Sequence, residues 1–61
     1  MITTDYTIND QAIGYVIEPD KYVIYLGERP WIAQPAELYV EGKTPEENCL
    51  DQIKFIVEHF N

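Results

Sequence analysis

The feature that most constrains this 61-residue chain is a helix signal that begins at Thr44. Thr44 precedes Pro45 and is followed three residues later by Glu47, which is a capping box with proline at the first helical position. Over residues 45–60 the apolar residues recur at helical spacing and form one stripe: Cys49, Leu50, Ile53, Ile56, Val57 and Phe60. One helix cannot bury such a stripe alone, so the residues before it must supply an apolar surface.

The residues before the helix show the alternating and β-branched patterns of strands. Turn residues separate four predicted strands, over residues 2–8, 12–18, 21–26 and 30–34. Pro30 has no backbone N–H to donate, so we expect its strand at an edge of the sheet. Residues 35–43 are predicted to form a loop. The expected fold is α+β, with a small antiparallel meander of three or four strands and one C-terminal helix packed on one sheet face. We expect residues 1–61 to form a single domain.

A two-residue turn at Pro19-Asp20 predicts the register of the two central strands. Glu18 then lies opposite Lys21, and Tyr15 lies opposite Ile24. The face predicted to point into the core carries Ile13, Tyr15, Ile17, Tyr22, Ile24 and Leu26. The other face carries Gly14, Val16, Glu18, Lys21, Val23 and Tyr25.

One helix covers one face of a sheet, so the second face is left open. A glycine-first turn at residues 27–28 places Trp31 beside Ile24 on the core face. The apolar residues predicted on the open face are Val16, Val23, Tyr25 and Ile32. A 61-residue chain builds a small core, and one cysteine allows no internal disulfide. We therefore expect self-association through this face, as a homodimer or a higher oligomer.

Phe55 lies off the apolar stripe of the predicted helix. At 3.6 residues per turn it points about 160° away from Ile53. Its neighbours on that side of the helix are Asn48, Asp51, Glu58 and His59. Single exposed apolar residues are common on soluble proteins, but a large aromatic ring inside an acidic rim is also a typical anchor for a partner. The candidate binding residues are therefore Phe55, Asp51, Glu58 and His59.

The charge balance narrows the class of partner. Eleven Asp and Glu residues against four Lys and Arg residues give a formal net charge of −7. Such a charge repels nucleic-acid backbones and anionic lipid. No apolar run approaches the roughly 18 residues of a membrane span, and the first residues lack the order of a signal peptide. We expect a cytoplasmic protein that binds another protein and neither nucleic acid nor a membrane.

The sequence offers little for catalysis. It contains no serine, and its one cysteine and one histidine lie about 15 Å apart along the predicted helix. Cys49 is expected to be a small core residue, and His59 a solvent-facing residue favoured near the helix C-terminus. The helix carboxylates are expected to complement the helix dipole and face solvent rather than bind a cation. We therefore predict no enzymatic activity, no cofactor and no metal site.

Several segments resemble short uncharacterised accessory proteins encoded by phages and prophages of Gram-positive bacteria. These segments are Ile24-Tyr25-Leu26-Gly27, Pro30-Trp31-Ile32, Gly42-Lys43-Thr44-Pro45-Glu46-Glu47 and Cys49-Leu50. The likeness spans most of the chain. It implies a phage accessory gene product in the cytoplasm of a bacterial host, and it assigns no functional residue.

Two functions are consistent with these observations. In the first, the protein is a non-enzymatic inhibitor that occupies the surface of a host protein, for example a nuclease or helicase of anti-phage defence. Its acidic side chains would then face a nucleic-acid-binding surface. In the alternative, it is a small structural or assembly component of a phage particle that docks through the open sheet face and an edge strand.

Overall fold

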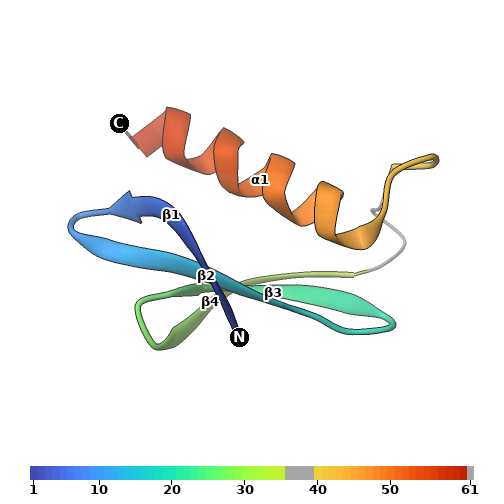
Figure 1. The fold of residues 1–61 in the computed structure, drawn as a ribbon, viewed down its shortest axis with the longest axis horizontal. Coiled ribbons are helices and arrows are strands. Elements are labelled where there is room, and N and C mark those ends of the chain that lie inside the picture. The colour runs from blue at the N-terminus through green and yellow to red at the C-terminus, as the bar shows by residue number, and fades with distance from the viewer. Residues whose placement is uncertain (36–39, 61) are drawn as a thin grey trace.

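The computed structural model describes residues 1–35 and 40–60. In these residues the elements are β1 (Ile2–Ile8), β2 (Gln11–Ile17), β3 (Lys21–Leu26), β4 (Arg29–Pro35) and α1 (Pro45–Phe60). The four strands form one antiparallel sheet in the order β1-β2-β3-β4. Helix α1 lies along one face of this sheet (Figure 1). The predicted α+β meander with a C-terminal helix is confirmed.

The predicted boundaries of three elements match the observed ones, and those of β2 and β4 differ by one residue at each end. Strand β2 begins and ends one residue earlier than residues 12–18, and β4 extends beyond residues 30–34 at both ends. The predicted loop over residues 35–43 falls partly outside the described residues, because residues 36–39 are not among them. Its described part ends in a turn, in which Lys43 N donates to Val40 O at 3.2 Å.

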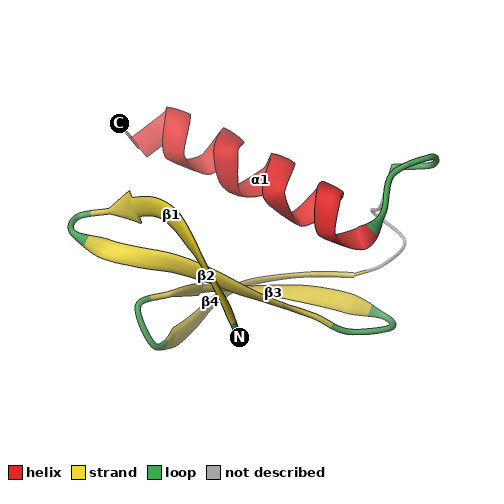
Figure 2. Cartoon of the chain, viewed as in Figure 1, coloured by secondary structure: helices red, strands yellow, loops and turns green. Residues whose placement is uncertain are grey.

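Short turns join neighbouring strands (Figure 2). Between β1 and β2, Asn9 and Asp10 have φ angles of 51° and 66°. Two residues in the left-handed region are typical of the hairpin turns that match strand twist, and Asn and Asp tolerate this region better than most residues. Between β3 and β4, Gly27 has a φ angle of 63°, as a glycine-first turn requires.

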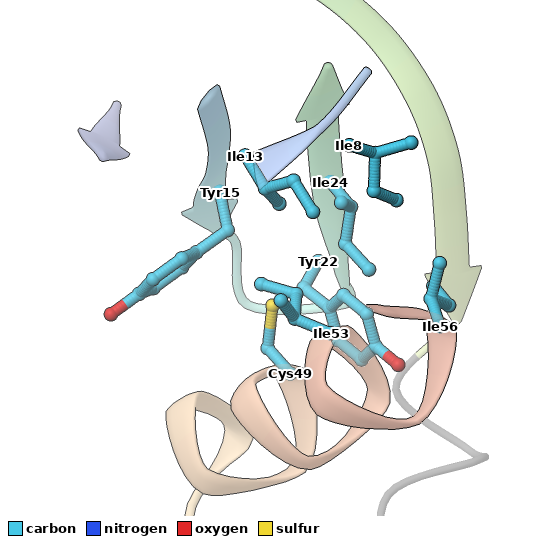
Figure 3. Packing of buried hydrophobic residues seen from close by; sticks show 8 residues of the cluster. All are labelled: Ile8, Ile13, Tyr15, Tyr22, Ile24, Cys49, Ile53 and Ile56. Carbon is cyan, nitrogen blue, oxygen red and sulfur yellow. The ribbon is translucent and has the colours of Figure 1, made fainter. Parts of the chain in front are cut away.

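The predicted register of the central hairpin is confirmed. Tyr15 lies opposite Ile24, and Glu18 N donates to Lys21 O at 2.8 Å across the intervening turn. This register places the core side chains between the sheet and α1 (Figure 3). The buried cluster consists of Ile8, Ile13, Tyr15, Tyr22, Ile24, Cys49, Ile53 and Ile56.

A bulge in β4 makes the predicted positions of Trp31 and Ile32 wrong. Tyr25 pairs with Pro30 but Ile24 pairs with Ile32, so Trp31 is an extra residue in β4. One extra residue moves every later residue of the strand to the opposite face. Ile32 therefore packs against the core rather than on the open face, and Trp31 is 37% exposed. Because the sheet order ends at β4, the edge position predicted from Pro30 is confirmed.

The position of Phe60 also differs from the prediction. Helical spacing assigned it to the apolar stripe, yet it is 62% exposed. It lies in the last turn of α1 and meets the bulged Trp31 edge to face, with ring centroids 5.7 Å apart and an interplanar angle of 66°. The stripe thus ends in a surface contact with β4 rather than in the buried cluster.

Strand β1 contains a second irregularity, between Thr3 and Thr7. Thr4 Oγ1 donates to Ile13 O at 2.7 Å and accepts from Tyr6 N at 3.1 Å. A side-chain hydroxyl therefore replaces part of the interrupted backbone ladder. Tyr6 and Ile8 reach the core, whereas Ile2 remains 53% exposed.

The capping box predicted at the start of α1 is confirmed. Thr44 N donates to Glu47 Oε1 and Glu47 N donates to Thr44 Oγ1, each at 3.1 Å. These reciprocal bonds satisfy amides that have no partner within the helix. In the part of the chain that the structure describes, no helix combines the length and apolarity needed to cross a membrane.

Candidate protein-binding surface

Phe55 is exposed, as predicted, with 55% of its surface accessible. It borders a shallow hollow of about 310 Å³ between α1 and the turn that precedes the helix. Val40, which is 56% exposed, lines the same hollow. We define the Phe55 surface as Val40, Lys43, Asp51, Phe55, Glu58 and His59. Asp51 shares the hollow with Phe55, and Glu58 and His59 continue the exposed helix face.

His59 supports the Phe55 ring, one helical turn away. The two ring centroids lie 4.1 Å apart at an interplanar angle of 32°. His59 Nδ1 lies 2.9 Å from Phe55 O, and because a carbonyl oxygen only accepts, Nδ1 donates this hydrogen bond. His59 is exposed near the helix C-terminus, as predicted. The hydrogen bond orients the His59 ring, and the ring contact restricts the Phe55 side chain before a partner binds.

Asp51 is engaged within the molecule. Its carboxylate accepts a hydrogen bond from Lys43 Nζ and forms an ion pair with it. This hydrogen bond lowers the pKa of Asp51 and raises the pKa of Lys43. The acidic rim predicted from Asp51 and Glu58 is therefore partly neutralised at Asp51, while Glu58 remains an exposed carboxylate beside Phe55.

Asn48 was predicted to lie on the exposed side of the helix, and this is wrong. It is 8% exposed, because the turn of residues 40–44 folds over it. Asn48 Oδ1 accepts from Val40 N at 2.9 Å, and Asn48 Nδ2 donates to Thr44 O at 3.0 Å. The amide thus ties the turn to α1 and places Val40 beside Phe55.

Asn48→Ala is expected to loosen this turn and destabilise the fold by about 1 kcal/mol, because Val40 N and Thr44 O each lose a bonding partner. The measurement is amide hydrogen exchange, in which the Val40 amide should exchange faster while the strand amides change little. Gln52→Ala, one turn further along α1, is the matched control. Unchanged protection of Val40 in Asn48→Ala would show that the amide does not hold the turn.

The face of the sheet opposite α1 carries three of the predicted contact residues. Val16, Val23 and Tyr25 lie there, each half-buried by its neighbours. A Cβ on Gly14 would lie 3.0 Å from Ile2 O and 3.0 Å from Met1 Sδ, so Met1 covers the bare backbone at this position. We call the face formed by Gly14, Val16, Val23 and Tyr25 the outer sheet face. In the described strands this face is mainly apolar.

Burial changes the acidity of two side chains in the core, Cys49 and Tyr15. Cys49 is fully buried, and burial followed by the charge of Glu46 raises the pKa of its thiol to about 12. Its predicted role as a core residue is confirmed. Burial, followed by a hydrogen bond to Glu46, also raises the pKa of the Tyr15 hydroxyl. Among the described residues, no group of three or more His, Cys, Asp or Glu side chains is placed to hold a metal ion.

The fold defines a small α+β domain with one helix on a four-stranded antiparallel meander. Comparison with protein-family models, with curated proteins and with solved structures gives no significant match.

Proposed function

We propose that the protein is a small, acidic, non-enzymatic binding protein of phage origin that inhibits a host anti-phage defence protein by occupying its surface. The Phe55 surface makes the contact, and the partner offers a basic groove that otherwise binds nucleic acid. The observation that carries this proposal is the large aromatic ring of Phe55, 55% exposed, in contact with the His59 ring and beside the exposed carboxylate of Glu58.

The geometry around Phe55 suits an anchor. Phe55 and Val40 together present apolar surface beside a hollow of about 310 Å³, into which a partner side chain fits. Aromatic residues that are rigid before binding lose little conformational entropy in a complex. Anchors of this kind, surrounded by a polar rim, supply a large share of the binding energy at protein interfaces.

The net charge of −7 supports a basic partner. Of the carboxylates near Phe55, Asp51 is paired with Lys43, so Glu58 contributes the exposed negative charge on this face. Distributed carboxylates also attract a basic surface at long range and raise the rate of association. Charge then controls encounter, and the Phe55 anchor controls the lifetime of the complex.

Phe55→Ala is expected to leave the domain folded and to weaken partner binding by more than about 1 kcal/mol, or about fivefold in Kd. The tagged protein is cross-linked in a lysate of a Gram-positive host, the captured protein is purified, and its affinity is measured for each variant. Phe60→Ala is the matched control, because Phe60 is equally an exposed aromatic residue of α1 but lies at Trp31.

Two results contradict the proposal. Equal affinity of Phe55→Ala and the unsubstituted protein shows that the Phe55 surface is not the contact. A captured partner whose binding is unaffected by competing duplex DNA does not use a nucleic-acid-binding groove. Glu58→Lys tests the electrostatic part: association should slow at low salt, and the difference should shrink as salt screens the charge.

The alternative function is a structural or assembly component of a phage particle. The outer sheet face favours it, because Val16, Val23 and Tyr25 form an apolar surface that α1 does not cover. Capture of particle proteins, together with tail genes as the neighbours of the coding sequence, would favour this alternative over the inhibitor.

A further inference from the structure

The two central strands are apolar on both faces. In an antiparallel sheet with one face in water, strands usually alternate between apolar and polar residues. Here the outward residues of β2 and β3 include Val16 opposite Val23, and Gly14 opposite Tyr25. Strands that are covered on both faces have this kind of sequence.

The apolar rows continue into β4. Val23 pairs with Ala33, and Tyr25 pairs with Pro30, so each row crosses from β2 to the edge of the sheet. Met1, 63% exposed, adds its side chain over Gly14. The result is a continuous patch rather than scattered apolar residues, and such patches on soluble proteins mark interfaces.

The edges of the same sheet are poorly suited to pairing with another strand. Strand β4 carries Pro30 and Pro35 together with the bulge at Trp31. Strand β1 is interrupted between Thr3 and Thr7 and carries an exposed Asp5 there. Prolines, bulges and charges are the features that keep edge strands from extending a sheet. An occupant of this sheet therefore packs onto its face.

The balanced charges at the end of the outer sheet face allow a second copy to be that occupant. The chain has a net charge of −7, and α1 presents Glu46, Glu47 and Glu58 to solvent, so most surfaces of two copies repel. At the end of the outer sheet face, Glu18 and Lys21 carry opposite charges and pair at 3.7 Å. Two outer sheet faces can therefore pack against each other without placing like charges together at the centre of the interface.

The size of the face is sufficient for a weak dimer. It spans about 20 Å by 20 Å, since strands lie about 4.8 Å apart and rise about 3.3 Å per residue. Two such faces in contact bury on the order of 1,000 Å² of accessible surface, which is near the lower limit for specific interfaces. We propose that the protein forms a homodimer in which the outer sheet faces of two copies pack against each other. This proposal is independent of the Phe55 surface.

Sedimentation velocity on the complete chain, from about 1 µM to about 500 µM, tests the proposal. The mass should rise from monomer to dimer with a micromolar Kd. Val23→Lys places a charge in the centre of the face. In a twofold-symmetric dimer both copies bring this charge into the interface. Its dimer Kd should rise at least about tenfold. Gln11→Lys is the matched control, because it adds the same charge at an exposed residue on the core side of the sheet and should dimerise normally.

The proposal is overturned if the unsubstituted chain stays monomeric at the highest concentration, or if Val23→Lys dimerises as tightly as Gln11→Lys. It is also overturned if Phe55→Ala abolishes the dimer while Val23→Lys does not, since self-association would then use the Phe55 surface. Circular dichroism checks that Val23→Lys is folded. If it is not, Val23→Thr keeps the β-branched shape and should weaken the dimer several-fold.

Discussion

Ile53→Ala is expected to bring the domain close to global unfolding. Ile53 is fully buried and belongs to the cluster between α1 and the sheet (Figure 3). Truncating a buried isoleucine to alanine costs about 2–5 kcal/mol, because it removes transfer free energy and leaves a cavity. A domain this small has only about 3–5 kcal/mol of stability from its core. The free energy of unfolding in urea, followed by circular dichroism, measures the loss.

Phe60→Ala is the control on the same helix. Phe60 is 62% exposed and meets Trp31 at the surface, so its loss should cost about 1 kcal/mol or less. If Ile53→Ala unfolds at the same urea concentration as the unsubstituted protein, α1 is not part of the cooperative core. The helix α1 could then separate from the sheet without unfolding it.

Stability is expected to fall steeply in mild alkali. The thiol of Cys49 has a pKa of about 12 in the folded protein, against about 8.5 for an exposed cysteine. Below the lower value both states hold the proton and Cys49 contributes no pH dependence. Between the two values the unfolded state loses the proton and the folded state keeps it, so the free energy of unfolding falls by up to about 1.4 kcal/mol per pH unit.

Urea unfolding at pH 7, 9 and 10 measures this slope, and comparison with Cys49→Ala separates the thiol from the tyrosine and lysine side chains, whose ordinary pKa values lie near 10. Cys49→Ala should be less stable at pH 7 and should lose less stability between pH 9 and pH 10. Alkylation gives an independent measurement, since only the thiolate reacts and the buried thiol should stay unmodified at pH 8 until urea unfolds the chain. Rapid alkylation of the folded protein at pH 8 would contradict the buried, protonated thiol.

The elements that sequence analysis predicted well are those whose signals are local. The capping box joins Thr44 to Glu47, three residues apart, so both partners are visible in one short segment. The central register follows from a two-residue turn, which leaves little freedom to the pairing of Tyr15 with Ile24. Phe55 was found because helical spacing alone separates it from the apolar stripe.

The incorrect predictions concern features that do not alter the periodic pattern of apolar residues in the sequence. The bulge in β4 adds one residue, Trp31, and the local sequence reads equally well with Trp31 or Ile32 facing the core. Asn48 was misplaced because its burial depends on a turn that begins eight residues earlier, at Val40. The ion pair of Lys43 with Asp51 depends on the same turn. Contacts across a turn of unknown path cannot be derived from helical spacing.

The strand order of the sheet also determines how the chain reaches its fold. Every strand pairs with its neighbour along the chain, in the order β1-β2-β3-β4, and the connecting turns are two or three residues long. Closing such short loops costs little entropy, and topologies rich in sequence-local pairing fold rapidly. The meander can form one hairpin at a time, because each paired strand offers its free backbone groups to the next strand along the chain. The contacts that are distant in sequence are those between α1 and the sheet, and they close the core.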